Sequence, residues 1–196
     1  MNWKEHLKNV KLKIARCIGV LYRVKHKLNI DALISIYYAL IYSHLNYCIQ
    51  VWGTADRTYL KQLLVMQNKF LRLITNSHNR TTAMPLFFRF KLLNVFDIFK
   101  LNMSKFVWSV INNMKEFSKG LFNNYFRRNT QIHQHNTRFK QDLHANKFRT
   151  NIGKKSTKHQ GQIIWNSLPG GIRNALSIAQ LKCNLKTYLI NEYQKD

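Results

Sequence analysis

Apolar side chains recur three and four residues apart along the first part of the chain, the spacing of one face of an α-helix. A first helix is predicted from about Trp3 to Lys27, with its lysines off the apolar stripe. A second is predicted from residues 29–31 to about Cys48, with Asn29 or Asp31 as its N-cap. A third runs from Asp56 to about Thr75. Three helices joined by short connections predict a compact helical bundle.

The second of these helices is apolar nearly all round, and no charged residue occurs between Asp31 and Asp56. Such a helix is expected at the centre of the bundle. A membrane span over residues 32–52 is the alternative, since a span needs about 20 apolar residues. Polar side chains such as His44 and Gln50 are costly in lipid, which favours the buried helix. The expected core residues are Tyr37, Leu40, Ile41, Leu45 and Trp52.

Beyond the bundle, residues 76–83 form a polar connector. A short helix is predicted around residues 85–90, and a longer one from about Val95 to Met114. Order is expected to return at Ile163, followed by a turn at residues 168–171. A last helix is predicted from Ser177 to about Tyr193. The whole chain is therefore expected to be mainly α, a helical bundle followed by a basic irregular segment and a C-terminal helix.

Between these helices, from about residue 118 to 160, the apolar periodicity fades and basic residues crowd in. This basic segment is expected to be irregular, with one or two short strands. Composition thus divides the chain into residues 1–77, 78–117, 118–160 and 161–196. Aromatic residues are interleaved with the cations, and two compatible hypotheses account for them: they stack on unpaired bases, or they pack against the helices.

The charge balance points to a polyanionic partner. Lys and Arg total 32 against 8 Asp and Glu, a net charge of +24. Nucleic acid, RNA or an RNA–DNA duplex, is the leading candidate, and an anionic membrane surface is second. A solvated basic surface without a specific partner is the remaining alternative. The predicted nucleic-acid-binding residues are Arg127, Arg128, Arg138, Lys140, Arg149, Lys154 and Lys155.

Catalytic chemistry finds little support in the sequence. The eight acids stand singly, whereas metal-dependent polymerases need clustered carboxylates to hold Mg²⁺. No catalytic residue, metal site or cofactor is therefore predicted. His133 and His135 lack a third ligand nearby and are interpreted as solvated. Cys48 with His44 allows a Cys–His nucleophile, but packing in an apolar helix is favoured. Three cysteines without a CxxC pair, and no apolar signal-peptide core, fit an intracellular location.

Several short motifs resemble the region that follows the palm in reverse transcriptases of Jockey-like and related non-LTR retrotransposons. They are Trp3-Lys4-Glu5-His6, Ile36-Tyr37-Tyr38-Ala39-Leu40-Ile41, Ser43-His44-Leu45-Asn46-Tyr47, Val51-Trp52-Gly53, Gln67-Asn68-Lys69, Pro85-Leu86-Phe87, Thr137-Arg138, Trp165-Asn166 with Leu168-Pro169, and Tyr188-Leu189. Each motif alone is weak, but together they span nearly the whole chain in order.

The resemblance implies RNA-directed DNA polymerase ancestry, with a thumb at about residues 1–77 that grips the template–primer duplex. The family's catalytic aromatic-Ala-Asp-Asp turn has no counterpart among the acids of this sequence. The chain is therefore expected to be a non-catalytic, nucleic-acid-binding part of such an enzyme, acting with a reverse-transcriptase palm. A stand-alone basic helical protein that binds RNA or chromatin is the alternative, and a membrane-associated protein is a third hypothesis.

Overall fold

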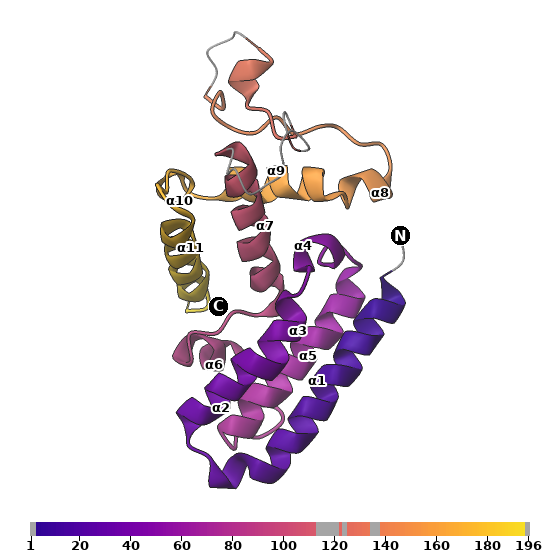
Figure 1. Ribbon diagram of the computed structural model, residues 1–196, viewed down its shortest axis with the longest axis vertical. Coiled ribbons are helices and arrows are strands. Elements are labelled where there is room, and N and C mark those ends of the chain that lie inside the picture. Colours follow the sequence, from indigo (N-terminus) through magenta and orange to yellow (C-terminus); the bar gives the residue numbers. More distant parts are fainter. Residues whose placement is uncertain (1–2, 113–121, 123–124, 134–137, 195–196) are drawn as a thin grey trace. The chain divides into compact units, whose positions relative to one another are not determined.

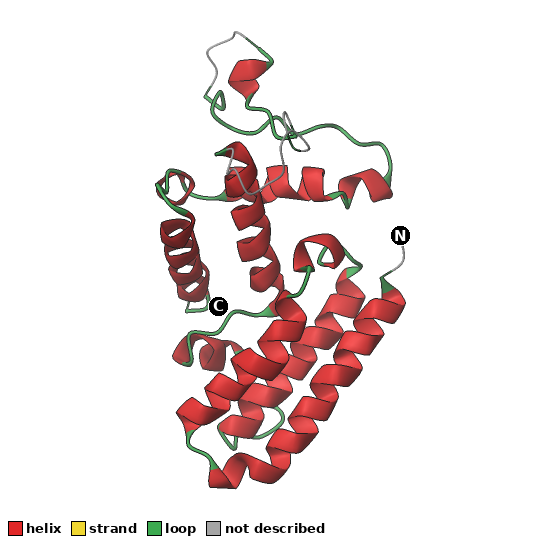
Figure 2. Cartoon of the chain, in the orientation of Figure 1, coloured by secondary structure: helices red, strands yellow, loops and turns green. Residues whose placement is uncertain are grey.

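The computed structural model describes residues 3–112, 122, 125–133 and 138–194 (Figure 1). Helices dominate these residues and no strand occurs among them, which confirms the mainly α prediction (Figure 2). Contacts divide the chain into two compact units. Unit 1 holds residues 1–99 and 186–196, and unit 2 holds residues 100–185. The four segments drawn from composition stay a prediction, and Met114, His135 and Thr137 lie outside the described residues.

Unit 1 contains most of the helices that the structure describes. In order they are α1 (Lys4–Val24), the 3₁₀ turn η1 (Lys25–Lys27), α2 (Ile30–Ile36), the π-helical turn η2 (Tyr37–Tyr42), α3 (Ser43–Asn46), α4 (Ile49–Trp52), α5 (Arg57–Ile74) and α6 (Met84–Arg89). The unit also takes the start of α7 (Val95–Ile111) and the end of α11 (Ile178–Glu192).

Helices α1 and α5 pack along each other (Figure 1). The apolar stripe of each helix is buried. Ile14 of α1 and Leu63 of α5 are fully buried, whereas the lysines of both helices face outward. Burying one such aliphatic side chain stabilises the fold by about 1.5–3 kcal/mol. The apolar spacing therefore explains why these two helices form and why they pair, and the predicted helical bundle is confirmed.

The second predicted helix is not continuous. Its N-cap is Asn29, whose side chain accepts a hydrogen bond from the Ala32 N–H, and the α-helix gives way to the π-helical turn η2 after Ile36. Helix α3 ends at Asn46, and Cys48 adopts a left-handed conformation with φ 48° before α4 begins. The Trp52 indole N–H donates to the freed Tyr47 carbonyl over 2.7 Å. This contact stabilises the break between α3 and α4.

The interruption changes which side chains are buried. Tyr37, Ile41, Leu45 and Trp52 are buried, as predicted, but Leu40 is 42% exposed, so its assignment to the core is wrong. The buried positions recur every four residues across the π turn, at Tyr37, Ile41 and Leu45, and Leu40 lies outside this series. Cys48 is also exposed, so its predicted packing in an apolar helix is wrong. Its helical register with His44 is lost because α3 has already ended.

A buried amide organises the centre of unit 1. The Gln67 side chain is fully buried, and its amide nitrogen donates to the Tyr37 hydroxyl over 2.8 Å and to the Leu93 carbonyl over 3.1 Å. Its oxygen accepts the Val95 N–H over 2.8 Å. Every one of these groups would cost free energy if it were buried without a partner. Gln67 therefore joins α5 to the π turn and to the start of α7.

Unit 2 comprises the rest of α7, then α8 (Asn151–Lys154), α9 (Thr157–Ser167), α10 (Gly170–Arg173) and most of α11, preceded by the 3₁₀ turn η3 (Asn129–Gln131). The prediction that order returns only at Ile163 is wrong, because Ser156 caps α9 by accepting the His159 N–H. The expected short strands reduce to one antiparallel bridge between Arg128 and Leu143 in the described residues.

Helix α9 packs closely on α7 within unit 2. A Cβ atom at Gly161 would lie 3.0 Å from both the Phe126 ring and Val107, so even a methyl group here would require these side chains to shift. The Trp108 indole of α7 donates to the Ala175 carbonyl beyond α10 over 3.1 Å. These contacts give the basic segment a fixed helical support. Among the described residues, no helix combines the length and apolar character needed to span a bilayer.

Candidate nucleic-acid interface

The basic segment is held by a short antiparallel pairing of its own backbone. On either side of the Arg128–Leu143 bridge, the Asn129 N–H donates to the Asp142 carbonyl over 2.9 Å, and the His144 N–H donates to the Arg127 carbonyl over 2.8 Å. The pairing leaves the Arg127 and Arg128 side chains exposed. It therefore presents two neighbouring cations from a backbone held by hydrogen bonds.

Helix α9 anchors this loop through two polar side chains one turn apart. The Asn166 side chain accepts the Leu143 N–H over 2.9 Å and donates to the Leu143 carbonyl over 2.8 Å, as a neighbouring strand would. The Gln162 oxygen accepts the Asn146 N–H over 3.4 Å. Leu143 itself is buried. The Trp165-Asn166 motif thus has a physical role, since its asparagine fixes the basic loop to the helix.

The acid of the segment is already engaged. Asp142 lies 2.6 Å from the Arg173 guanidinium, measured between Oδ1 and Nη1, and both side chains are partly buried. The sequence contains no other acid between Glu116 and Glu192. The positive charge on the loops is therefore not balanced by an acid of their own segment.

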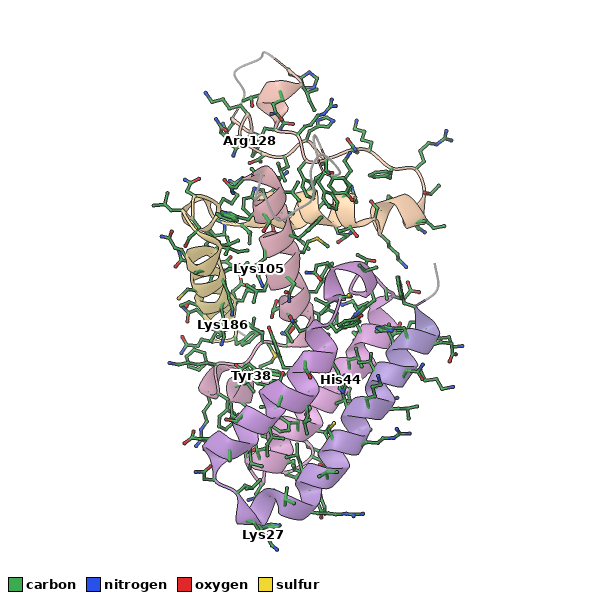
Figure 3. The ribbon with its side chains drawn as sticks, viewed as in Figure 1. Lys27, Tyr38, His44, Lys105, Arg128 and Lys186 are labelled. Atoms are coloured by element: carbon green, nitrogen blue, oxygen red, sulfur yellow. The ribbon has the colours of Figure 1, made fainter. Side chains whose placement is uncertain are left out.

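All seven predicted binding residues are exposed. Arg127, Arg128 and Lys140 come together through the backbone pairing, since the Thr130 N–H donates to the Lys140 carbonyl. Arg128, labelled in Figure 3, also donates to the Gln141 side chain over 2.8 Å. A second group surrounds α8, where Arg149 precedes the helix and Lys154 and Lys155 stand at its end. Arg138 lies in the turn before Lys140.

Most aromatic side chains of the segment are used for packing. Tyr125 contacts both Phe122 and Phe126, and all three rings contact Phe106 of α7 edge to face, with centroids between 4.9 and 6.3 Å apart. Phe148 contacts the His159 ring in the same way. Phe139, by contrast, is 63% exposed. Of the five interleaved aromatics, Phe139 has the face most available for stacking on a base.

A pocket of about 280 Å³ lies beside the backbone pairing, lined by Tyr125, Arg127, Ile132, His144, Lys158 and Gln162, among others. The Lys158 ammonium lies 5.3 Å from the centroid of the Tyr125 ring, and burial raises the pKa of that tyrosine. Sequence reasoning did not select Lys158 or His144. Recognising the Ser156 cap would have placed Lys158 and Gln162 one turn apart on α9.

Unit 1 carries a second basic surface, which we call the bundle groove. It has a volume of about 600 Å³ and lies between α1 and the end of α5, with Tyr22, Lys25, Lys69 and Arg72 among its lining residues. The Lys25 ammonium donates to the side chain of Asn76 over 2.6 Å and lies 5.5 Å from the Tyr22 ring centroid. Both units therefore offer cations beside an aromatic ring.

Lysine side chains also lie close to other charged or aromatic groups outside the basic segment. Lys105 of α7, labelled in Figure 3, is partly buried; this burial and the nearby Lys182 ammonium both lower the pKa of its amine. In unit 1, the Lys186 ammonium lies 5.9 Å from the centroid of the Tyr38 ring. Positive charge is thus spread over several described surfaces rather than confined to the basic segment.

Within the part of the chain that the structure describes, no three metal-ligating side chains come together. His133 and His144 face each other with ring centroids 6.2 Å apart.

No family model matches the chain, and neither a curated protein nor a solved structure matches it.

Proposed function

We propose that the chain binds nucleic acid through its phosphate backbone, with little sequence preference. The observation that carries the proposal is the cluster of exposed cations in the described part of the basic segment of unit 2, whose own acid, Asp142, is engaged by Arg173. Exposed cations gain from a polyanion, because each neutralised phosphate releases condensed counterions. Backbone contacts of this kind carry no base information.

Within that proposal, the chain is the post-palm part of a non-LTR retrotransposon reverse transcriptase. The support is the ordered set of motifs along the sequence, together with the helical bundle of unit 1 in the region where the resemblance implies a thumb. Its substrate would be the RNA–DNA duplex held behind the palm, and its partner would be the palm itself. The stand-alone RNA- or chromatin-binding protein is the competing proposal.

Fluorescence anisotropy with an RNA–DNA hybrid, a DNA duplex and a single-stranded RNA tests the binding proposal. A protein with about 6–10 phosphate contacts loses on the order of 10³–10⁵ in affinity between about 50 and 200 mM salt. We expect a loss of this size with all three probes. Affinity that does not change with salt, or no binding at the lowest salt, would contradict the proposal.

The coding DNA directly upstream separates the two origins. An in-frame or decayed palm with an Asp-Asp turn favours the reverse-transcriptase origin, and an unrelated upstream sequence favours the stand-alone protein. For a biochemical test, a related palm supplied in trans should extend a primer further with the chain than without it. Equal extension would argue against a thumb role.

A further inference from the structure

The pocket beside the backbone pairing gathers several anion-binding groups in a small volume. Arg127 reaches it from the loop and Lys158 from the first turn of α9. His144 and Gln162 add a ring nitrogen and an amide to its lining. Tyr125 lies against the Lys158 ammonium, so the ring holds the lysine at the pocket. The cations therefore come from two different elements that the fold brings together.

The charge of this pocket favours an anion. Arg127 and Lys158 both bring positive charge to its lining, and each would attract an anion bound there. The one acid in this part of the sequence, Asp142, is engaged by Arg173. A bound anion would therefore lie between cations from two elements, with no acid of this segment free to compete for them.

We propose that this pocket binds a phosphate group of a nucleic-acid strand, with Arg127 and Lys158 as its charged ligands and His144 as a further donor. Guanidinium and ammonium groups both form short, charge-assisted hydrogen bonds to phosphate. A volume of about 280 Å³ suits a single phosphate with its sugar rather than a duplex. The inference rests on the proposed function for the molecule that carries the phosphate.

Titration of the full chain with adenosine monophosphate, followed by NMR of the histidine side chains, tests the pocket directly. A His144→Gln variant assigns the resonance. We expect the nucleotide to shift the His144 signal with a dissociation constant on the order of 1 mM, and adenosine to leave it unchanged. The absence of a shift with the nucleotide would overturn the proposal.

Paired variants separate the pocket from general charge. Arg127→Ala with Lys158→Ala should weaken nucleotide binding at least about tenfold. Lys147→Ala with Lys182→Ala removes the same charge from exposed positions that do not line the pocket, and should change binding less than about twofold. Equal losses in the two variants would overturn the proposal. If the first variant unfolds, Arg127→Lys with Lys158→Arg keeps the charge and should retain binding.

Oligonucleotides with a 5′-phosphate or a 5′-hydroxyl then identify the source of the phosphate. A preference for the 5′-phosphate that the pocket variant abolishes assigns a strand end, and an equal loss with both assigns an internal phosphodiester. If the parent binds neither oligonucleotide yet adenosine monophosphate shifts His144, the proposed function fails and the pocket stands. If the pocket variant and the control variant bind oligonucleotides equally well, and adenosine monophosphate does not shift the His144 signal, the pocket proposal fails and the proposed function stands.

Discussion

The Tyr193 hydroxyl donates a hydrogen bond to the buried carboxylate of Asp97, joining the residue that follows α11 to the first turn of α7. Asp97 is 5% exposed, and its carboxylate also accepts from the Asn94 amide over 2.7 Å. The Tyr193 oxygen in turn accepts the Asn94 N–H over 3.2 Å. One of the few acids of a basic chain is thus committed to holding unit 1 together.

Removing the Tyr193 hydroxyl should destabilise the protein. Tyr193→Phe leaves the Asp97 carboxylate short of one donor in a buried site, which costs about 1–3 kcal/mol. Chemical denaturation followed by circular dichroism measures the change. Tyr47→Phe removes a hydroxyl from a side chain that is 70% exposed and should change stability by less than about 0.5 kcal/mol. Equal effects would mean that the hydroxyl contributes nothing in the buried network.

The contribution of Tyr193 should also depend on pH. Burial, together with the nearby Asp97 carboxylate, raises the pKa of Tyr193 above its ordinary value of 10.0. The unfolded chain then releases this proton at lower pH than the folded one, so the stabilisation is fully present below about pH 10 and is lost above it. The stability difference between the parent and Tyr193→Phe should be constant from about pH 7 to 9 and shrink above about pH 10. A difference that grows with pH would contradict this assignment.

The Gln67 amide should be among the costliest side chains to replace. Gln67→Leu leaves the Tyr37 hydroxyl, the Leu93 carbonyl and the Val95 N–H without this partner, and each orphaned buried group costs about 1–3 kcal/mol. The midpoint of denaturation should fall accordingly. Gln62→Leu, on the exposed side of the same helix, provides the matched control and should leave the midpoint nearly unchanged.

The sequence predicted the parts of the fold that depend on periodicity. The stripes of α1 and α5, the Asn29 cap and the position of Asp56 before α5 all follow from residue type and spacing. The break at Cys48 does not, because a left-handed residue is ordinarily signalled by Gly or Asn. Here the conformation is stabilised by a tertiary contact, the bond from the Trp52 indole to the Tyr47 carbonyl. Periodicity contains no information about such a contact.

The candidate site was predictable in charge and not in geometry. Exposure of all seven chosen cations follows from their chemistry. Their grouping depends on Asn166, which fixes Leu143 from 23 positions away in the sequence. Lys158 and His144 line one pocket for the same reason. These contacts join polar side chains to backbone groups that are far away in the sequence. Neither the loop nor its pocket therefore produces a local sequence pattern that could have predicted it.

Leu40 and Ile41 are neighbours in the π-helical turn, but Leu40 is exposed and Ile41 is buried, so their substitution should change stability by different amounts. Leu40→Ala should cost less than about 1 kcal/mol, because Leu40 is exposed and leaves no cavity, whereas Ile41→Ala should cost about 2–5 kcal/mol. Thermal and chemical unfolding of the two variants measure the difference. A continuous α-helix with Leu40 in the core would give Leu40→Ala a loss as large as that of Ile41→Ala, and this outcome would contradict the fold described for residues 37–42.

The salt dependence of binding should identify which basic surface holds the nucleic acid. Arg127→Ala, Arg128→Ala, Lys154→Ala and Lys155→Ala together remove four exposed cations from unit 2. Each lost phosphate contact lowers the slope of log affinity against log salt by about 0.9 on a duplex. We therefore expect this quadruple variant to bind more weakly and to lose up to about 3–4 units of slope.

A second quadruple variant, with Lys25, Lys61, Lys69 and Arg72 replaced by Ala, removes the same charge in and beside the bundle groove and is the matched comparison. Net charge changes equally in both variants, so long-range attraction is weakened to a similar degree. Only the variant that removes direct phosphate contacts should lose slope. If the unit 2 variant keeps the parent's slope and the groove variant loses it, the basic segment is a solvated linker and the bundle holds the duplex. If both lose slope, the strand contacts both units.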